Sequence, residues 1–574
     1  MPGVQITLIG GLPLVFVSLY FLGRLIWQQI SRKSVKPSLA AAHLLTGTGT
    51  IWNHPVFIAL ACSRIYAPNL LMEALYNGAL QTICLFFVRL ASVLLCLALW
   101  NHLYKTGHSN VNEYVKCRYR SSWINLLYNI NTIFGFSYLM KLESGPTGYA
   151  FVDFLVADRL ISFSIIFWLI LTSLGGFETT MVAVVVIWVL EILGHLSAAV
   201  KIPKLQFVER AVDDLSVNIC LTNLGLPSFV IIFFQMMTVL PFYRLYRTAG
   251  TRTKANFAIA LSIGIFAFDQ FWALLEASTI HSLSLENKIA HQYRIRAMIG
   301  GLAQSGKMDA KKIKWQGIES QNISVYTSKL WDLNTLGGLF LFGPVIGHYK
   351  AYLIIQLHLM TCHVLEHLLP RWLAEGLFTS YPELRVLYTC IRMLLSTFVF
   401  IQLTRAIYTI GNANFRGILF YLPLLPSILT LTVGTFLVLG LMQKILKATI
   451  VVPMTAIQLL VSVFVLGLFS WSSNEEDFVT QSRIWSQGFQ SMPSGWMCGV
   501  AWFPTMLASF FAFFMMTLAR MLQVPSTDAL EVTEEGKEKE AEEAEEAAGF
   551  NDDDIEVNGD RGLAGSVGDF TADP

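Results

Sequence analysis

The chain has 574 residues, of which 54% are hydrophobic and only 14% are charged, and its formal net charge at pH 7 is +1. A soluble protein of this length needs more polar surface to cover its core, so the composition excludes the ordinary soluble classes. The near-zero net charge conceals a split, because residues 525–574 hold 17 acidic residues against three basic ones, a net charge of −14, and the remainder therefore carries +15.

Long apolar segments follow one another through residues 1–283. Each is long enough to cross a bilayer as a helix, which predicts an all-α, polytopic integral membrane protein. The predicted spans of this N-terminal bundle are Val4–Trp27, Val56–Tyr76, Ala79–Tyr104, Ser122–Met140, Phe151–Gly175, Thr179–Val200, Ile219–Tyr243 and Phe257–Leu283.

The segment Val56–Tyr76 is ambiguous, because it contains Arg64, Pro68 and Glu73. An interfacial or re-entrant helix is the alternative to a span. Basic residues follow both Trp27 and Tyr104, and two successive helices cannot both end in the cytoplasm unless something crosses between them. The required crossing favours Val56–Tyr76 as a true span.

Residues 284–328 form the longest internal polar segment, and their excess of Lys and Arg predicts a basic cytoplasmic loop. Residues 329–524 form a second predicted bundle, with spans near 330–347, 351–369, 384–407, 417–442, 449–471 and 497–522. The total is about 12–14 transmembrane helices. The tail, residues 525–574, is too charged to build a core, so we expect it to be disordered and able to bind a basic partner.

Ionisable residues at membrane depth are costly, which makes each of them a candidate for function. Asp269 and Glu276 lie seven residues apart with Trp272 between them, so they share one helix face near the middle of their span. Two carboxylates facing a cavity would bind a cation or share a proton, which makes this pair the first candidate for an ion- or proton-coupling site. The alternative is that they only neutralise a basic partner such as Arg89 or Arg392.

Glu191 and His195 are four residues apart, a spacing that puts both on one face of a helix. A carboxylate beside an imidazole inside a membrane is the usual material of a proton relay, so this pair is the second coupling candidate. A structural pair near the helix end is the alternative.

Two weaker patterns complete the candidate residues. Asn125, Asn129 and Thr132 form a polar stripe that could line a pathway, although such residues often hydrogen-bond neighbouring helices instead. His363 and His367 have the i, i+4 spacing of a metal-binding pair, but two ligands are too few and a third must come from elsewhere.

No motif assigns the chain to a family. The stretch GLAQSGKM, Gly301 to Met308, has a methionine where a phosphate loop needs a magnesium-binding hydroxyl. The stretch VYTSKLWDLN is similar to the retinal-bearing helix of microbial rhodopsins, but Lys329 lies at the polar start of its span and the spans are too many for that family.

The sequence therefore favours a transporter or channel-like protein that uses intramembrane carboxylates, in a membrane whose identity stays open. The alternative is a non-catalytic multispanning structural or assembly protein of a cellular, organellar or viral membrane. No catalytic motif has convincing spacing, so an enzyme ranks third, and no catalytic residue or cofactor is predicted. The expected partners are the lipid bilayer and a small solute or ion, without nucleic acid.

Six predicted spans separate the 284–328 loop from the acidic tail, and an even number of spans returns the chain to the side from which it started. The loop and the tail are therefore expected on the same, cytoplasmic, side. Single cysteines placed at Ser305 and at Ser526 should therefore react with a membrane-impermeant maleimide from the same side of sealed vesicles. Labelling from opposite sides would refute the parity.

Overall fold

The computed structural model of the protein describes residues 15–24, 44–47, 50–64, 70–108, 110–133, 167–199, 242–277, 346–368 and 381–411, together with Pro13, Tyr66, Leu339, Gly343, Pro344, Ala456 and Leu460. The expected 284–328 loop, the spans beyond residue 411 and the acidic tail lie outside these residues. The span count and the tail therefore stay predictions.

The described part of the chain is helical. Its labelled elements are η1 (Ile51–Asn53), α3 (Pro55–Ser63), α4 (Leu70–Lys105), α5 (Val111–Tyr119), α8 (Gly176–Ala199), α11 (Tyr243–Thr248), α16 (Gly347–His363), the π-helical turn η4 (Val364–Leu368) and α18 (Tyr381–Gly411). Further described helices include Val15–Arg24, residues 122–133, residues 167–173 and Arg252–Ala277; the last of these is called the 252–277 helix below.

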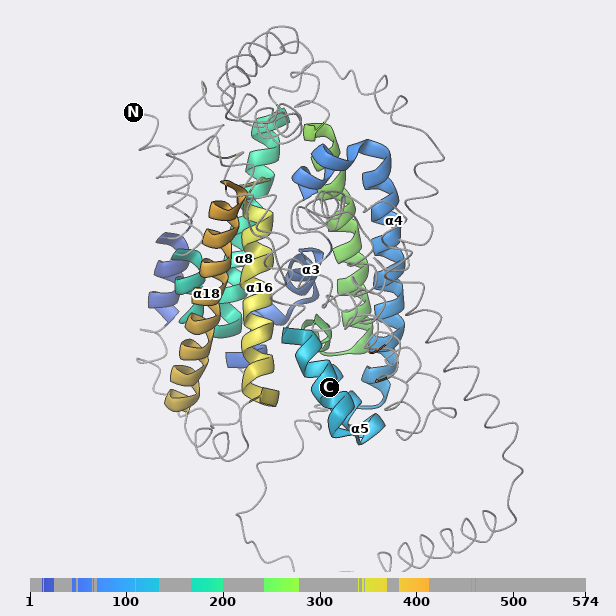
Figure 1. Ribbon diagram of the computed structural model, residues 1–574. Helices are drawn as coiled ribbons and strands as arrows, with labels where there is room; N and C mark the ends of the chain where they lie inside the picture. The colour runs from blue at the N-terminus through green and yellow to red at the C-terminus, as the bar shows by residue number, and fades with distance from the viewer. Residues whose placement is uncertain are drawn as a thin grey trace, which may run out of the picture.

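Two groups of helices face each other across α3 (Figure 1). On one side α16 packs along α8 and also contacts α18. On the other side α4 lies beside the 252–277 helix, where the rings of Phe86 and Phe266 stack with their centroids 5.4 Å apart. The short helix α3 contacts α8 and α16, and the side chain of Arg64 at its C-terminal end reaches Asp269 on the 252–277 helix, so this end lies where the two groups meet.

The sequence accounts for the ends of these helices. Pro55 occupies the first turn of α3, where its missing N–H costs nothing, and His54 Nδ1 accepts a hydrogen bond from the Val56 N–H. Asn110 caps α5 through a 2.7 Å bond from the Glu113 N–H to its Oδ1. Gly176 has φ +68° at the first residue of α8, directly after a tight turn, a conformation that favours glycine.

Two predicted boundaries are wrong. We expected one span to end at Tyr76 and the next to begin at Ala79, but α4 runs without interruption from Leu70 to Lys105. Asn77 and Gly78 are weak helix formers, yet neither removes a backbone donor as proline does. The break lies earlier, where α3 ends at Ser63 ahead of Pro68. Likewise α16 begins at Gly347, just after Pro344, and not at residue 351.

Two helices in the described part of the chain are long and apolar enough to cross a membrane by themselves, Gly176–Ser197 and Arg252–Ala277. They correspond to the predicted spans Thr179–Val200 and Phe257–Leu283. The candidate coupling residues lie on these two helices.

Glycines let the backbone of α8 approach the segment that leads into α16. A Cβ atom on Gly194 would lie 2.7 Å from the Leu339 carbonyl oxygen, and one on Gly343 would lie 2.4 Å from the Leu190 carbonyl oxygen. Close backbone approach through small residues is how membrane helices gain packing energy. The contact also fixes the backbone beside Glu191.

Gly343→Ala should therefore destabilise the protein by about 1–3 kcal/mol, because a rigid carbonyl has to move. Thermal unfolding in detergent would show this as a lower midpoint. Gly264→Ala is the matched control, since its Cβ would meet no heavy atom within 4 Å. Equal midpoints for the two variants would contradict the packing argument.

Candidate functional site

Arg64 is the residue on which the site is built. It is the C-cap of α3, with φ −73° and ψ −12°, and its backbone N–H bonds to the carbonyls of Ala61 and Cys62. Its side chain is fully buried. A buried guanidinium needs counter-charges close by, because leaving it unpaired in a low-dielectric medium costs several kcal/mol.

Two carboxylates supply those counter-charges. Arg64 Nη1 lies 2.5 Å from Glu191 Oε2 on α8 and 3.3 Å from Asp269 Oδ2 on the 252–277 helix. Both carboxylates are buried. The guanidinium thus joins the two helix groups through a single nitrogen.

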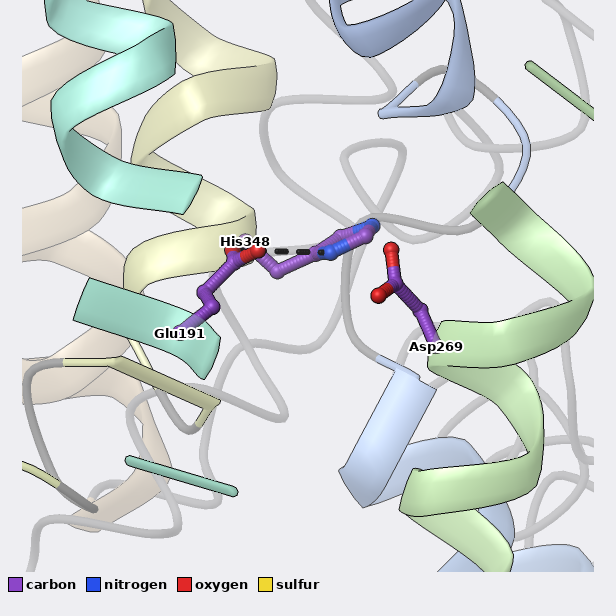
Figure 2. Close-up of side chains that lie close together, drawn as sticks. All are labelled: Glu191, Asp269 and His348. Carbon is purple, nitrogen blue, oxygen red and sulfur yellow. Dashed lines mark ion pairs between the residues drawn. The ribbon is translucent and has the colours of Figure 1, made fainter. Parts of the chain in front are cut away.

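His348 approaches the same point from the first turn of α16. Its Nδ1 hydrogen-bonds Arg64 Nη1 and lies 3.6 Å from Glu191 Oε1. Figure 2 shows His348 and Glu191 together on one side and Asp269 facing them from the other. Glu191, Asp269 and His348 each offer a donor atom, and these atoms lie within 4.8 Å of one another.

A second pair, His195 and Glu276, links the same two helices. His195 Nδ1 and Glu276 Oε1 are 2.6 Å apart, and the imidazole stacks on the Trp272 ring at a centroid distance of 5.6 Å. Glu276 is fully buried and His195 nearly so. Together, Arg64, Glu191, Asp269, His348, His195 and Glu276 are called the charge cluster below.

The charge cluster is acidic when its histidines are neutral, because three carboxylates face one guanidinium. Protonation of both imidazoles would bring its net charge to zero. Its carboxylates and imidazoles are groups that can bind protons or small cations, and any change of their charge would alter the attraction between the helices that hold them.

The four predicted coupling residues therefore lie in one cluster, although not in the predicted pairs. Glu191 and His195 share a helix face as expected, but Glu191 pairs with Arg64 and His195 pairs with Glu276. The basic partner of Asp269 is Arg64, and not Arg89 or Arg392. Arg392 instead donates to the Tyr388 hydroxyl, Thr180 Oγ1 and the Ile354 carbonyl.

The polar stripe is only partly accounted for. Thr132 Oγ1 donates to the Tyr128 carbonyl at 2.9 Å, a local bond within its helix. The Oδ1 atoms of Asn125 and Asn129 are buried and have no hydrogen-bond donor among the described residues. A pathway-lining role for these residues stays a prediction.

His363 and His367 lie side by side at the far end of α16, with ring centroids 5.2 Å apart. The predicted third ligand is not supplied by the described part of the chain, where no other His, Cys, Asp or Glu completes a metal-ligating group around them. The neighbouring Glu366 is engaged by Arg244 at 2.6 Å, and His367 lies 3.9 Å from the same carboxylate oxygen.

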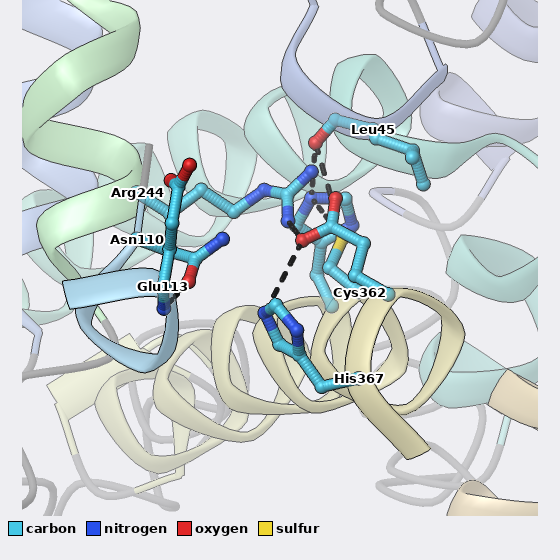
Figure 3. Close-up of polar contacts among 8 residues, drawn as sticks. Leu45, Asn110, Glu113, Arg244, Cys362 and His367 are labelled. Atoms are coloured by element: carbon cyan, nitrogen blue, oxygen red, sulfur yellow. Dashed lines mark hydrogen bonds and ion pairs between the residues drawn. The ribbon is translucent and has the colours of Figure 1, made fainter. Parts of the chain in front are cut away.

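This end of α16 carries a polar network of its own (Figure 3). His358 contacts the Tyr388 hydroxyl through Nδ1 at 2.7 Å and the Leu45 carbonyl through Nε2 at 3.1 Å. Because a carbonyl only accepts, Nε2 carries the proton and Tyr388 donates to Nδ1. The Cys362 thiol lies 3.9 Å from the same carbonyl. The network holds the backbone at Leu45 against α16 and α18.

Sequence reasoning missed Arg64 and His348 as members of the site. Arg64 was noted only as a complication within an uncertain span, and His348 lies at the boundary that was placed wrongly. The available signal was their neighbourhood, because each stands within four residues of a proline that interrupts an apolar segment.

Comparison with known proteins gives a fold but no family. No family model matches the chain, and no curated protein matches it. Among solved structures, it is similar to a Na⁺-coupled sialic acid symporter in a substrate-bound outward-open state. The TM-score is 0.57 at 12% sequence identity, and the similarity covers 89% of this chain and 98% of that one.

This likeness shows the fold class. The chain is an all-α polytopic membrane protein with the fold of a helical membrane transporter. The charge cluster thus lies between helices of this fold, at the C-terminal end of α3.

Removing both counter-charges of Arg64 should cost far more than removing either one. Glu191→Gln or Asp269→Asn alone should destabilise by about 1–3 kcal/mol, since the other carboxylate remains. The double variant leaves Arg64 without a carboxylate and should lose about 3–5 kcal/mol beyond the sum of the two single losses. Yield and thermal midpoint in detergent measure this.

The control is Glu178→Gln, which breaks a partly exposed pair with Arg24 at 3.1 Å and should cost less than about 1 kcal/mol. Additive losses in the double variant would show that Arg64 does not depend on these two carboxylates.

Proposed function

We propose that this protein is a secondary transporter that couples the movement of a small solute to proton or cation binding at the charge cluster. The observation that carries this proposal is the convergence of Arg64, Glu191, Asp269 and His348 from separate elements on one buried point. A scaffold protein needs only isolated ion pairs, which hold helices together without concentrating titratable groups.

The end of α3 at the charge cluster supports the same proposal. Transporters commonly place their sites at broken helices, since an interrupted backbone is tolerated at membrane depth only where protein or a water-filled cavity satisfies it. Arg64 stands at the end of such a helix, and the Tyr66 hydroxyl beyond it hydrogen-bonds Ser262 Oγ at 2.7 Å. The helix break and the cluster thus coincide.

The interface between the two helix groups is also suited to movement. The α8 and α16 side is held by backbone contact at Gly194 and Gly343, whereas the link to the 252–277 helix is made by charges and by the His195–Glu276 pair. A change in the protonation of the charge cluster therefore alters the contact between the two helix groups. The similar solved structure is named as a Na⁺-coupled sialic acid symporter, which makes sialic acid a first probe.

Asp269→Asn should abolish gradient-driven uptake while leaving folded protein, because the amide keeps the shape but cannot carry the charge. Glu276→Gln should do the same or move the pH dependence of uptake, because His195 then loses its ionised partner. The measurement is uptake of radiolabelled sialic acid, and of a panel of amino acids and sugars, into proteoliposomes under an inward proton or sodium gradient.

Yield and monodispersity in detergent must be recorded beside the flux. Collapse of the folded protein in both variants would favour a structural role for the carboxylates. Normal yield with normal uptake would remove both the coupling role and the structural one.

A further inference from the structure

The environment of Arg64 Nη1 is that of a bound cation. This one nitrogen lies 2.5 Å from Glu191 Oε2 and 3.3 Å from Asp269 Oδ2, and it hydrogen-bonds His348 Nδ1. The same residues offer donor atoms within 4.8 Å of one another, as the ligands of one metal ion do (Figure 2). The guanidinium nitrogen thus stands where such an ion would stand.

Arg64 is also held in an unusual way for an arginine. Arginine normally presents two parallel N–H groups to a carboxylate. Here the buried Nε and Nη2 atoms have no hydrogen-bond acceptor among the described residues, and both carboxylates meet Nη1 alone. The side chain therefore acts on the cluster as a point charge, as a metal ion would.

The position of Arg64 adds to this environment. It caps the C-terminal end of α3, where the last carbonyls leave a partial negative charge. A cation is favoured at that place whether it is free or tethered to the chain. Two carboxylate oxygens and one imidazole nitrogen are ligands that suit a first-row divalent ion such as Co²⁺ or Zn²⁺.

We propose that Arg64 is a tethered occupant of a cation site formed by Glu191, Asp269 and His348. While the guanidinium is in place, the site admits no metal ion. When the side chain is removed, the three donors bind one first-row divalent cation. One consequence rests on the proposed transport function. Because Arg64 fills the cation site, the mobile cation that the charge cluster binds during transport is a proton.

The test is metal binding by purified protein without a histidine tag, in detergent, so it does not depend on finding the transported solute. Arg64→Ala leaves two buried carboxylates without their cation, and this variant will be hard to fold. The charge-compensated variant Arg64→Ala/Glu276→Gln restores the net charge and keeps all three donors. Arg64→His is a second variant, which adds a fourth ligand at the same place.

Wild-type protein should give no visible Co²⁺ absorption band, whereas Arg64→Ala/Glu276→Gln and Arg64→His should each bind about one Co²⁺, displaced by Zn²⁺. Adding His348→Ala to either variant should weaken binding at least about tenfold. Arg392→Ala is the matched control: Arg392 is also fully buried, but its acceptors are neutral, so its removal should create no metal site.

Three results would overturn the proposal. One is His348-dependent Co²⁺ binding by the wild type, which would mean that Arg64 does not fill the site. Another is a folded variant that binds no metal. The third is failure of both variants to fold even when Zn²⁺ is present throughout expression and purification, because a cation in that place should restore the charge balance. These metal-binding results test only the cation site. The proposed transport function is tested separately, by uptake in the Asp269→Asn variant.

Discussion

The charge on Arg64 organises the described structure, because a guanidinium at membrane depth has to be neutralised by groups from wherever the fold can supply them. Its counter-charges come from α8 and from the 252–277 helix, which belong to different helix groups, and His348 adds a contact from α16. Desolvated charges attract one another strongly over short distances, so the pairing fixes the relative position of the groups. The same low dielectric makes that position sensitive to the loss or gain of a single proton.

The structural class of the protein, an all-α polytopic membrane protein, could be predicted from composition and segment length alone. Apolar segments of spanning length can satisfy their backbone only as helices in a bilayer, and α8 and the 252–277 helix lie close to where hydropathy placed them. The boundaries that failed share a cause. Hydropathy averages over many residues, so it does not report that a helix ends at Ser63 while Asn77 and Gly78 leave α4 intact.

The site was within reach of the sequence only in part. The spacings of Asp269 and Glu276, and of Glu191 and His195, gave the correct faces, because helical periodicity is local. Their partners come from other elements, and partner choice depends on how helices distant in the chain are packed. Arg64 lies 127 residues before Glu191 and 205 before Asp269, a separation that no local pattern resolves. Apart from the nearby Pro68, the available clue was energetic cost, since a buried arginine in an apolar segment must find an acidic partner.

The length of α4 has a mechanical consequence. From Phe86, which stacks on the 252–277 helix near the level of the charge cluster, to Lys105 the helix extends about 28 Å. Its far end is fastened to the turn after α11 by Tyr104, which donates to the Gly250 carbonyl, and to the first residue of the 252–277 helix by Asn101, whose Oδ1 accepts from Arg252. A rotation of about 10° around Phe86 would carry this end through about 5 Å, since a helix of this length behaves as a stiff rod. Leverage of this kind would turn a small rearrangement among buried charges into a displacement of the surface at the opposite end of the helix.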